Sequence, residues 1–201
     1  MTGPTTSPTT ESVVLLDEAG AAIGTADKAS VHGPDTPLHL AFSCYVFDSK
    51  ARLLVTQRAL HKKTWGGAWT NSCCGHPAPE EDISEAVRRR VGQELGLELD
   101  DVRLVLPAFR YRAVMPDGTV ENEMCPVFVA TTTDQVQLDP DEVEAATWVP
   151  WVEFRSEVLS GDRDVSPWCV EQVAALPTDA LDAPPADLDQ LPAAVRGSRG
   201  R

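Results

Sequence analysis

Short hydrophobic runs separated by polar turns fill the first three quarters of the chain. They have the length and composition of β-strands: 13–16, 40–47, 53–56, 102–106, 109–114, 124–130 and 146–149. Turn residues follow two of these runs, Asp48-Ser49-Lys50 and Met115-Pro116-Asp117-Gly118-Thr119, and predict β-hairpins. If the second hairpin is symmetric about its aspartate, Tyr111 lies opposite Glu123, and Glu121 lies on the same face of the sheet.

Two segments have the apolar spacing of helices. In the first, Asp82 can cap the N-terminus and Gly96 ends the helix. An apolar side chain recurs there every four residues, at Ile83, Val87, Val91 and Leu95. The second segment runs from about Pro167 to Leu176 and carries Trp168, Val170 and Val173. Together the elements predict a mixed β-sheet with flanking helices, an α+β domain with α/β/α layers.

The two ends of the chain lack these patterns. Residues 1–10 are rich in Thr, Pro and Ser, and from 177 onward Ala, Pro, Asp and Gly replace most large apolar side chains. Such compositions do not support a packed core. We therefore expect one domain, residues 11–176, between a disordered N-terminal tail (1–10) and a low-complexity, disordered C-terminal tail (177–201). A chain of 201 residues, 42% of them hydrophobic, can bury one sizeable core.

Composition narrows the kind of partner. The chain has 17 Lys and Arg against 31 Asp and Glu, a net charge of -14. This argues against nucleic acid and against a membrane surface, since both require a basic footprint. No apolar run reaches the roughly 18 residues that would span a bilayer, and the N-terminus lacks a secretory pattern. Five irregularly spaced cysteines form no disulfide framework, so we expect a cytoplasmic protein, with no obligatory protein partner evident.

The positive charge is clustered, at Arg58, Lys62-Lys63, Arg88 to Arg90, Arg110 and Arg112. A locally basic pocket in an acidic shell suits a small anionic ligand. In the first helix, Arg90 and Glu94 lie one turn apart on the same face. Taken alone, the pair fits equally well an i, i+4 salt bridge on a solvated face or a phosphate-binding arginine beside a metal ligand.

Residues 75–97 resemble the Nudix box. The matching positions are Gly75, Glu81, Arg89, Arg90, Val91, Gln93, Glu94, Gly96 and Leu97. A typical hydrolase of this superfamily has glutamates where this chain has Arg90 and Gln93. Those acids gather the magnesium ions that activate water against a diphosphate. The resemblance therefore implies a Nudix-like fold whose hydrolytic machinery is missing, with Glu94 left to hold one ion.

Four separated motifs resemble type 1 isopentenyl diphosphate isomerases. They are residues 38–42 (LHLAF), 65–77 (WGGAWTNSCCGHP), 111–112 (YR) and 121–126 (ENEMCP). The resemblance extends from about Val13 to Trp168. It implies an enzyme of isoprenoid biosynthesis that interconverts isopentenyl and dimethylallyl diphosphate, without flavin or nicotinamide. Protonation at C4 and deprotonation at C2, on opposite faces, need an acid, a base and a dry pocket.

The resemblance assigns the groups that move protons. Cys74 matches the cysteine that takes the proton from C2, and Cys73 beside it is the competing choice. Glu123 with Tyr111 would deliver the proton to C4 from the opposite side. A free thiol titrates near about 8.5, and a cation or helix N-terminus nearby lowers its pKa. The remaining cysteines are expected to be small buried hydrophobes: Cys44, Cys125 and Cys169.

The histidines match no zinc-finger spacing, and spacing alone indicates loop or core residues. The resemblance instead implies a six-coordinate site for one divalent ion, Mn, Mg or Zn, formed by His32, His39, His76, Glu121 and Glu123. It also implies that a second ion, Mg, arrives with the diphosphate and is held by Glu94 and the backbone region of Cys74. His61 lies outside this pattern and is expected at the surface.

Further side chains match substrate-binding positions of the family: Lys28, Arg58, Lys62, Arg90 and Trp168. The four cations would hold the diphosphate, although Lys28 is as readily a solvated surface charge. Trp168 would wall the pocket, where a ring face beside a carbocation contributes about 2 kcal/mol or more when desolvated. A tryptophan at helical spacing is also commonly a core residue.

Two other functions are compatible with the same fold. A Nudix diphosphate hydrolase acting on nucleotides or prenyl diphosphates is disfavoured by Arg90 and Gln93 and leaves Cys74 unexplained. A non-catalytic metal- or nucleotide-binding module would tolerate loss of the thiol and of both strand glutamates, yet all three are present. The isomerase hypothesis accounts for all of these residues.

Overall fold

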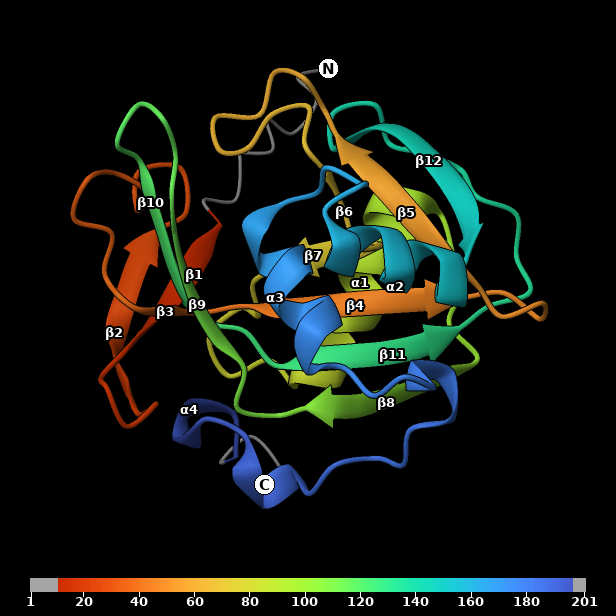
Figure 1. Ribbon diagram of the computed structural model, residues 1–201. Coiled ribbons are helices and arrows are strands. Elements are labelled where there is room, and N and C mark those ends of the chain that lie inside the picture. The colour runs from red at the N-terminus through yellow and green to blue at the C-terminus, as the bar shows by residue number, and fades with distance from the viewer. Residues whose placement is uncertain (1–10, 197–201) are drawn as a thin grey trace, which may run out of the picture.

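The computed structural model describes residues 11–196; the expected N-terminal tail, residues 1–10, lies outside the described residues, as do 197–201. The described chain forms two β-sheets with helices packed on the larger one (Figure 1). The smaller sheet has the order β2-β1-β3-β10-β9. Its strands are β1 (Ser12–Leu16), β2 (Ala22–Asp27), β3 (His39–Leu40), β9 (Arg110–Val114) and β10 (Val120–Met124).

The larger sheet has the order β12-β5-β4-β11-β8, with β6 added to β5 and β7 added to β4. Its strands are β4 (Phe42–Phe47), β5 (Arg52–Arg58), β6 (Trp69–Thr70), β7 (Cys73–Gly75), β8 (Asp101–Leu106), β11 (Val127–Thr131) and β12 (Val143–Pro150). The central strands β4 and β11 run parallel, and their other neighbours are antiparallel.

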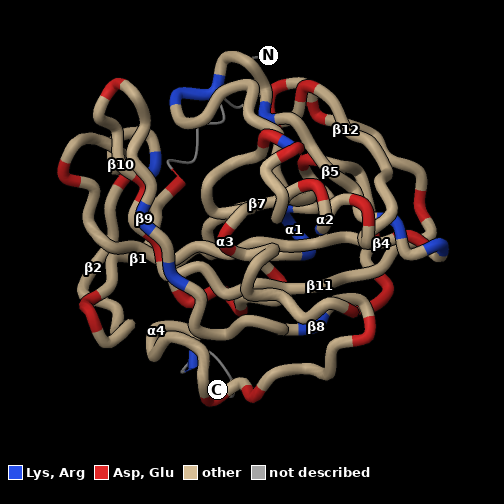
Figure 2. Tube along the Cα trace, in the orientation of Figure 1, with Lys and Arg blue, Asp and Glu red and all other residues tan. Residues whose placement is uncertain are grey.

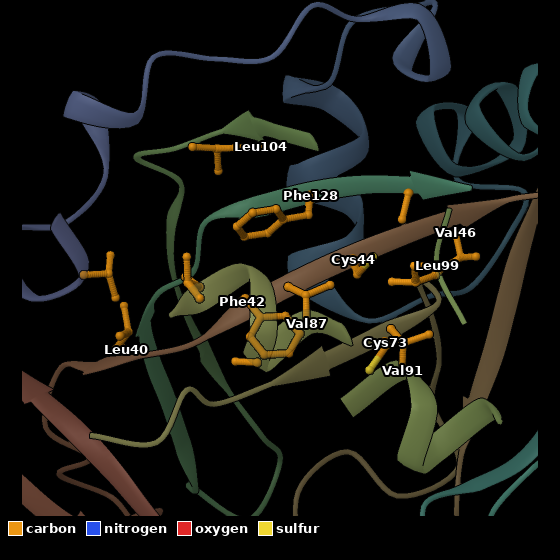
Figure 3. Close-up of a cluster of buried hydrophobic side chains, with 14 of the residues drawn as sticks. Leu40, Phe42, Cys44, Val46, Cys73, Val87, Val91, Leu99, Leu104 and Phe128 are labelled. Atoms are coloured by element: carbon orange, nitrogen blue, oxygen red, sulfur yellow. The ribbon is translucent and has the colours of Figure 1, made fainter. Parts of the chain in front are cut away.

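Helices cover both faces of the larger sheet. In Figure 1, α1 (Ile83–Leu95) lies behind it, and α2 (Trp151–Ser160) and α3 (Pro167–Ala175) lie in front. Because successive side chains of a strand point to opposite faces, β4 contributes to two separate cores. Phe42, Cys44 and Val46 pack against α1 (Figure 3), whereas Tyr45 and Phe47 pack against α2 and α3. The predicted α+β, α/β/α layered fold is confirmed.

Helix α1 is held at both ends and along one face. The carboxylate of Asp82 accepts hydrogen bonds from the backbone N–H groups of Ser84 and Glu85, and Gly96 ends the helix with a φ of 66°. Burying an aliphatic side chain contributes roughly 1.5–3 kcal/mol. All four residues of the predicted stripe are buried: Ile83, Val87, Val91 and Leu95. The predicted cap, stripe and stop are confirmed.

The hairpin register is also confirmed. Strands β9 and β10 pair antiparallel with Tyr111 opposite Glu123, and Gly118 closes the turn with a φ of 88°. Only glycine adopts that conformation without strain. This register places Tyr111, Glu121 and Glu123 on one face.

Two of the predicted strands are each divided between the sheets. The run 40–47 ends its first strand, β3, at Leu40 and resumes as β4, and the run 124–130 leaves β10 at Met124 and resumes as β11. Pro126, which has no N–H to donate, lies in the second break. Strand β3 pairs parallel with β10, and β4 pairs parallel with β11. The two crossings therefore lie side by side where the sheets meet.

Several elements were not predicted. Helix α2 follows β12 directly, and its exposed Val152 and Leu159 obscure the apolar stripe. Strand β2 is largely exposed and contains a glycine, while β6 and β7 are two and three residues long. In α3, Val170 is half-exposed rather than packed. Within the described residues, no helix is long and apolar enough to cross a membrane.

The expectation of a disordered tail from residue 177 is wrong for 177–196. This segment contains η1 (Ala180–Asp182), η2 (Leu188–Gln190) and α4 (Ala193–Arg196), and Figure 1 shows it running past β8. Four of its apolar side chains are buried, those of Ala180, Ala183, Leu191 and Val195, whereas Leu188 is exposed. Backbone hydrogen bonds of 2.8–2.9 Å join Ala186 to Leu104 and Ala194 to Gly20. The low apolar content led to the wrong prediction because these four side chains and the backbone bonds are enough to hold the segment against the core.

Candidate active site

A cavity of about 870 Å³ is lined by residues from both sheets. All but one of the predicted site residues line it: Lys28, His32, Arg58, Lys62, Cys74, His76, Arg90, Glu94, Tyr111, Glu121, Glu123 and Trp168. The exception, His39, is fully buried beside Glu123. Residues that are distant in the sequence are therefore brought to one site.

Tyr111 connects the two strand glutamates. Its hydroxyl oxygen lies 2.8 Å from an oxygen of Glu123 and 3.0 Å from an oxygen of Glu121. A phenol has one proton, so it donates to one carboxylate, and the other contact requires a second proton. Burial and the charge of Glu123 raise the pKa of Glu121 to about 7, so Glu121 carries that proton in a large share of molecules near neutral pH. Tyr111 then donates to Glu123 and accepts from Glu121.

Glu123 remains ionised beside its neighbours. Burial alone would raise the pKa of this carboxyl, but the adjacent rings of His39 and His76 outweigh burial and hold the pKa well below its usual range. One carboxylate oxygen lies 3.2 Å from Nε2 of His76 and 3.4 Å from Nε2 of His39. The other oxygen accepts from Tyr111. Glu123 therefore faces the histidines and the phenol at once.

Three histidines and Glu123 form a compact group. One ligand atom from each of His32, His39, His76 and Glu123 lies within 4.8 Å of all the others. The fifth predicted ligand, Glu121, is outside this group and is connected to it through Tyr111. His61, expected at the surface, is exposed.

The donor atoms of this group suit a divalent cation. Nδ1 of His39 lies 2.9 Å from the carbonyl oxygen of Pro37, so Nδ1 donates to that oxygen and Nε2 points towards Glu123. Nε2 of His32 is buried and has no hydrogen-bond partner among residues 11–196. Burial and His39 lower the pKa of His32 to about 4, so its ring is neutral at physiological pH. Three imidazole nitrogens beside one carboxylate are a ligand set that suits a divalent metal ion.

Removal of a bound ion is expected to lower the melting temperature by roughly 5–10 °C. A ligand present at 100 times its Kd stabilises the fold by about 2.7 kcal/mol, and 1 kcal/mol corresponds to about 2–4 °C for a chain of this size. Thermal unfolding before and after treatment with a chelator, together with elemental analysis, measures this. The variant His32→Ala should lose the metal, and the control His61→Ala should keep it. Full metal content in His32→Ala would contradict the assignment.

The two adjacent cysteines point to opposite faces of β7. Cys73 lies opposite Cys44 of β4 and is 2% exposed in the core against Val87 and Val91 of α1 (Figure 3). Cys74 lies opposite Ser43 and lines the cavity. Of the two thiols, Cys74 alone is therefore accessible to a ligand.

The surroundings of Cys74 differ from the sequence expectation. Helix α1 begins at Ile83, nine residues after Cys74 in the sequence. Burial raises the pKa of Cys74 to about 12, although hydrogen bonds with Ser43 and Asn71 and the charge of Arg58 act against burial. A lowered pKa was expected, and the structure shows the opposite. Desolvation outweighs the single nearby cation.

Asn71 is a residue of the site that sequence reasoning missed. Its side chain is fully buried, and its N–H₂ group donates to the backbone carbonyls of Cys44 and Cys73 at 3.1 and 2.9 Å. These bonds turn its oxygen towards Cys74 Sγ at 3.3 Å and Nε1 of Trp168 at 3.2 Å. The only sequence signal was its place in the run 65–77. Asn71 joins the thiol to the aromatic wall.

Close packing behind the cavity requires a glycine. A Cβ atom on Gly75 would lie 2.9 Å from Cγ of Arg90 and 2.9 Å from Cζ of Phe42. Such contacts are not tolerated without displacement. Glycine here lets β7 approach α1, so that Arg90 and Cys74 face the same cavity.

Each predicted diphosphate-binding cation has a partner. Arg90 pairs with Glu94 and lies 3.3 Å from Glu142, which also accepts from Lys62. Arg90 and Glu94 are 6% and 7% exposed, so the alternative of a solvated surface pair is wrong. Nζ of Lys28 lies 2.6 Å from Glu11, and the Arg58 guanidinium donates to the carbonyl of Thr64. Basic positions are fewer than acidic ones along the trace, and they include α1 and the loop after β5 (Figure 2).

Glu142 is the second residue that sequence reasoning missed. It lines the cavity and joins two cations, yet it lies in an acidic stretch where nothing distinguishes one carboxylate from the next. Only the fold reveals its position.

Trp168 is both a core residue and a wall of the cavity. It is 2% exposed, and its ring centroid lies 5.6 Å from that of Tyr111 and 5.7 Å from that of Trp65. Both alternatives raised by the sequence are therefore correct for this residue.

Comparisons with known proteins define first the class of the chain. The sequence model of the NUDIX domain matches residues 37–169, and the chain belongs to this superfamily. Among solved structures, a protein from Deinococcus radiodurans superposes with a TM-score of 0.63 at 17% identity, covering 82% of this chain and 98% of that one. A MutT NUDIX hydrolase from Burkholderia pseudomallei has a TM-score of 0.52 at 18% identity, covering 68% and 96%. At these identities the likeness concerns the fold alone.

Curated relatives define the family within that class. The isopentenyl-diphosphate Delta-isomerase of Saccharopolyspora erythraea is 57% identical over 184 residues, which cover 89% of this chain and 95% of the relative. That of Mycolicibacterium vanbaalenii is 56% identical over 168 residues, covering 84% and 92%. The chain belongs to the isopentenyl-diphosphate Delta-isomerase family. The resemblance inferred from the four motifs is confirmed.

Proposed function

We propose that the chain interconverts isopentenyl and dimethylallyl diphosphate by moving one proton to C4 and another from C2 within the cavity. Membership of the isomerase family supports the activity. The single observation that carries the mechanism is the placement of Cys74 and Glu123 on one cavity from different sheets, β7 of the larger and β10 of the smaller. A double-bond shift requires an acid at one carbon and a base at another.

The hydrogen-bonded series Glu121–Tyr111–Glu123 delivers the proton to C4. Because Glu123 is ionised at rest, the proton for C4 reaches it from the phenol of Tyr111, and Glu121 replaces the proton of the phenol. The three groups are joined by hydrogen bonds of 2.8 and 3.0 Å. Addition of the proton at C4 leaves a tertiary cation at C3. The rings of Tyr111 and Trp168 line the cavity there and supply electron-rich faces.

Cys74 exchanges the second proton, at C2. Removal of that proton forms the C2=C3 double bond, and in the reverse direction the thiol donates it. Burial favours the neutral thiol, so the thiolate is a strong base when it forms, and C2–H beside a cation is readily deprotonated. Exclusion of water by the surrounding aromatic rings prevents capture of the cation.

The diphosphate would be held by Lys28, Arg58, Lys62 and Arg90. Glu11, Glu94 and Glu142 pair with Lys28, Arg90 and Lys62, whereas Arg58 donates to the carbonyl oxygen of Thr64. Glu94 would hold a magnesium ion that accompanies the diphosphate. His32, His39, His76 and Glu123 would hold the other divalent ion, Mn, Mg or Zn. When bound, such an ion draws electron density from the Glu123 carboxyl and increases its acidity. The cytoplasmic location expected from composition remains a prediction.

The activity is tested by a proton and phosphorus NMR time course of isopentenyl diphosphate with the protein and Mg²⁺ in heavy water. We expect dimethylallyl signals to grow, with deuterium entering the new methyl group and C2 and with the diphosphate intact. Release of phosphate would support a hydrolase instead. No change with the metal bound would contradict the isomerase and favour a binding module.

A further inference from the structure

A chain of fully buried polar side chains lies behind Cys74. Ser43, Tyr45 and Gln172 are each 0% exposed, on β4 and α3, amid the core that packs against α2 and α3. Burying polar groups is costly unless each finds a hydrogen-bond partner, and apolar side chains of similar size would fill the same space. These polar residues therefore need an explanation beyond packing.

Gln172 joins the hydroxyl groups of Tyr45 and Ser43. The hydroxyl of Tyr45 donates to Oε1 of Gln172 at 3.0 Å, and Nε2 of Gln172 donates to Oγ of Ser43 at 2.9 Å. Ser43 Oγ accepts that bond, and its own proton points elsewhere. Two sulfur atoms are within reach: Cys74 Sγ at 3.3 Å and Cys125 Sγ at 3.4 Å.

The sulfur of Cys74 thus lies between one donor and one acceptor. Asn71 Oδ1 can only accept a hydrogen bond, and it accepts one from the Cys74 thiol at 3.3 Å. The bonds from the Asn71 amide nitrogen to two backbone carbonyls hold this oxygen towards the sulfur. Ser43, on the neighbouring strand β4, can donate a hydrogen bond to the same sulfur. The thiol keeps a partner for its proton, and a sulfur that has lost its proton keeps a donor.

We propose that Ser43, oriented by Gln172 and Tyr45, is a positioning residue that donates a hydrogen bond to Cys74 Sγ during the proton exchange at C2. This inference rests on the proposed function. In the forward step Cys74 acts as the thiolate, its own proton having passed to solvent. The C2–H bond breaks, its electron pair forms C2=C3, and the proton goes to the sulfur. The Ser43 hydroxyl holds that sulfur in place and stabilises its charge before the proton arrives, while Ser43 itself does not line the cavity.

The variant Ser43→Ala tests this in the same heavy-water assay. Loss of a hydrogen bond to a charged group should lower kcat by about 10- to 100-fold. KM for isopentenyl diphosphate should stay within about twofold, because the cavity lining is unchanged. Since only the C2 step is slowed, the cation returns to starting material more often, and deuterium at C4 of recovered isopentenyl diphosphate should rise relative to product.

Matched variants separate this role from packing. Gln172→Met removes the group that orients Ser43 and should move the deuterium ratio in the same direction, and Tyr45→Phe should do so less. Cys125→Ala removes the other sulfur within reach of Ser43 and should leave kcat unchanged. The double variant Ser43→Ala/Gln172→Met leaves neither partner of their bond unpaired, so it reports on the reaction if Ser43→Ala unfolds.

A folded Ser43→Ala variant with unchanged kcat would overturn the inference. So would a lower kcat with an unchanged deuterium ratio, because a structural defect slows both proton transfers alike. Absence of turnover in the unsubstituted chain would overturn the proposed function itself, and that result is seen before any variant is compared.

Discussion

Replacing Cys74 by alanine is expected to lower kcat by about 10²–10⁴-fold, the contribution typical of a positioned proton-transfer group. The thiol lines the cavity with Asn71 on one side and Ser43 on the other, and no second thiol reaches the cavity among the described residues. The folded state should persist, since alanine fits wherever cysteine does. Steady-state rates with isopentenyl diphosphate, together with thermal unfolding, measure both effects.

Cys73→Ala is the matched control for this prediction. Cys73 is adjacent in sequence but faces α1, so its replacement removes a sulfur atom from the core and should reduce stability modestly while most activity is kept. An inactive Cys73 variant beside an active Cys74 variant would reverse the assignment of the two thiols.

Replacing Glu123 by glutamine is expected to abolish detectable turnover and to lower metal content together. The amide has the size of the carboxylate but neither its charge nor its second acceptor oxygen, so it fails as a partner of His39 and His76 and as the acceptor in the chain through Tyr111. Loss of general acid catalysis alone accounts for about 10²–10⁴-fold. Rates, elemental analysis and circular dichroism on one preparation separate chemistry, metal and fold.

Two further variants in the β9–β10 hairpin separate the role of Glu123 from general effects of changing the hairpin. Asn122→Ala changes the neighbouring residue of β10, whose amide donates to the carbonyl of Thr36 instead of facing the cavity, and should keep both activity and metal. Tyr111→Phe leaves the carboxylate in place, so metal should be retained while kcat falls. Undiminished turnover by a metal-free Glu123→Gln protein would remove Glu123 from both roles.

Much of the fold follows from local patterns that need no tertiary information. The capped stripe of α1 and the glycine turn between β9 and β10 are set by residues within a few positions of one another, so the pairing of Tyr111 with Glu123 could be predicted. The division of single hydrophobic runs between two sheets could not. Ala41 and Pro126 interrupt continuous strand-like sequence, and only long-range pairing places the break.

The same distinction holds for the site. His39 and His76 stand in recognisable motifs, and the fold brings them, together with His32, to Glu123. Asn71 contacts Trp168, 97 positions away, and Glu142 contacts Arg90, 52 positions away. Contacts at such separations cannot be predicted from local sequence spacing. The pKa of Cys74 was misjudged for the same reason, because desolvation depends on everything packed around the sulfur.

The carboxylates that accompany the cavity's cations have a consequence for selectivity. Arg90, Lys62 and Lys28 are each paired with Glu94, Glu142 or Glu11, so these three cations offer little surplus positive charge to an anion in solution. A singly charged phosphate or a chloride ion gains little binding free energy by displacing a carboxylate that already contacts one of these cations. In the proposed function, a diphosphate that brings its own magnesium ion would contact the arginine and lysine side chains and also bind Glu94 through the metal. We therefore expect the site to select metal-bound diphosphates over simpler anions of the cell.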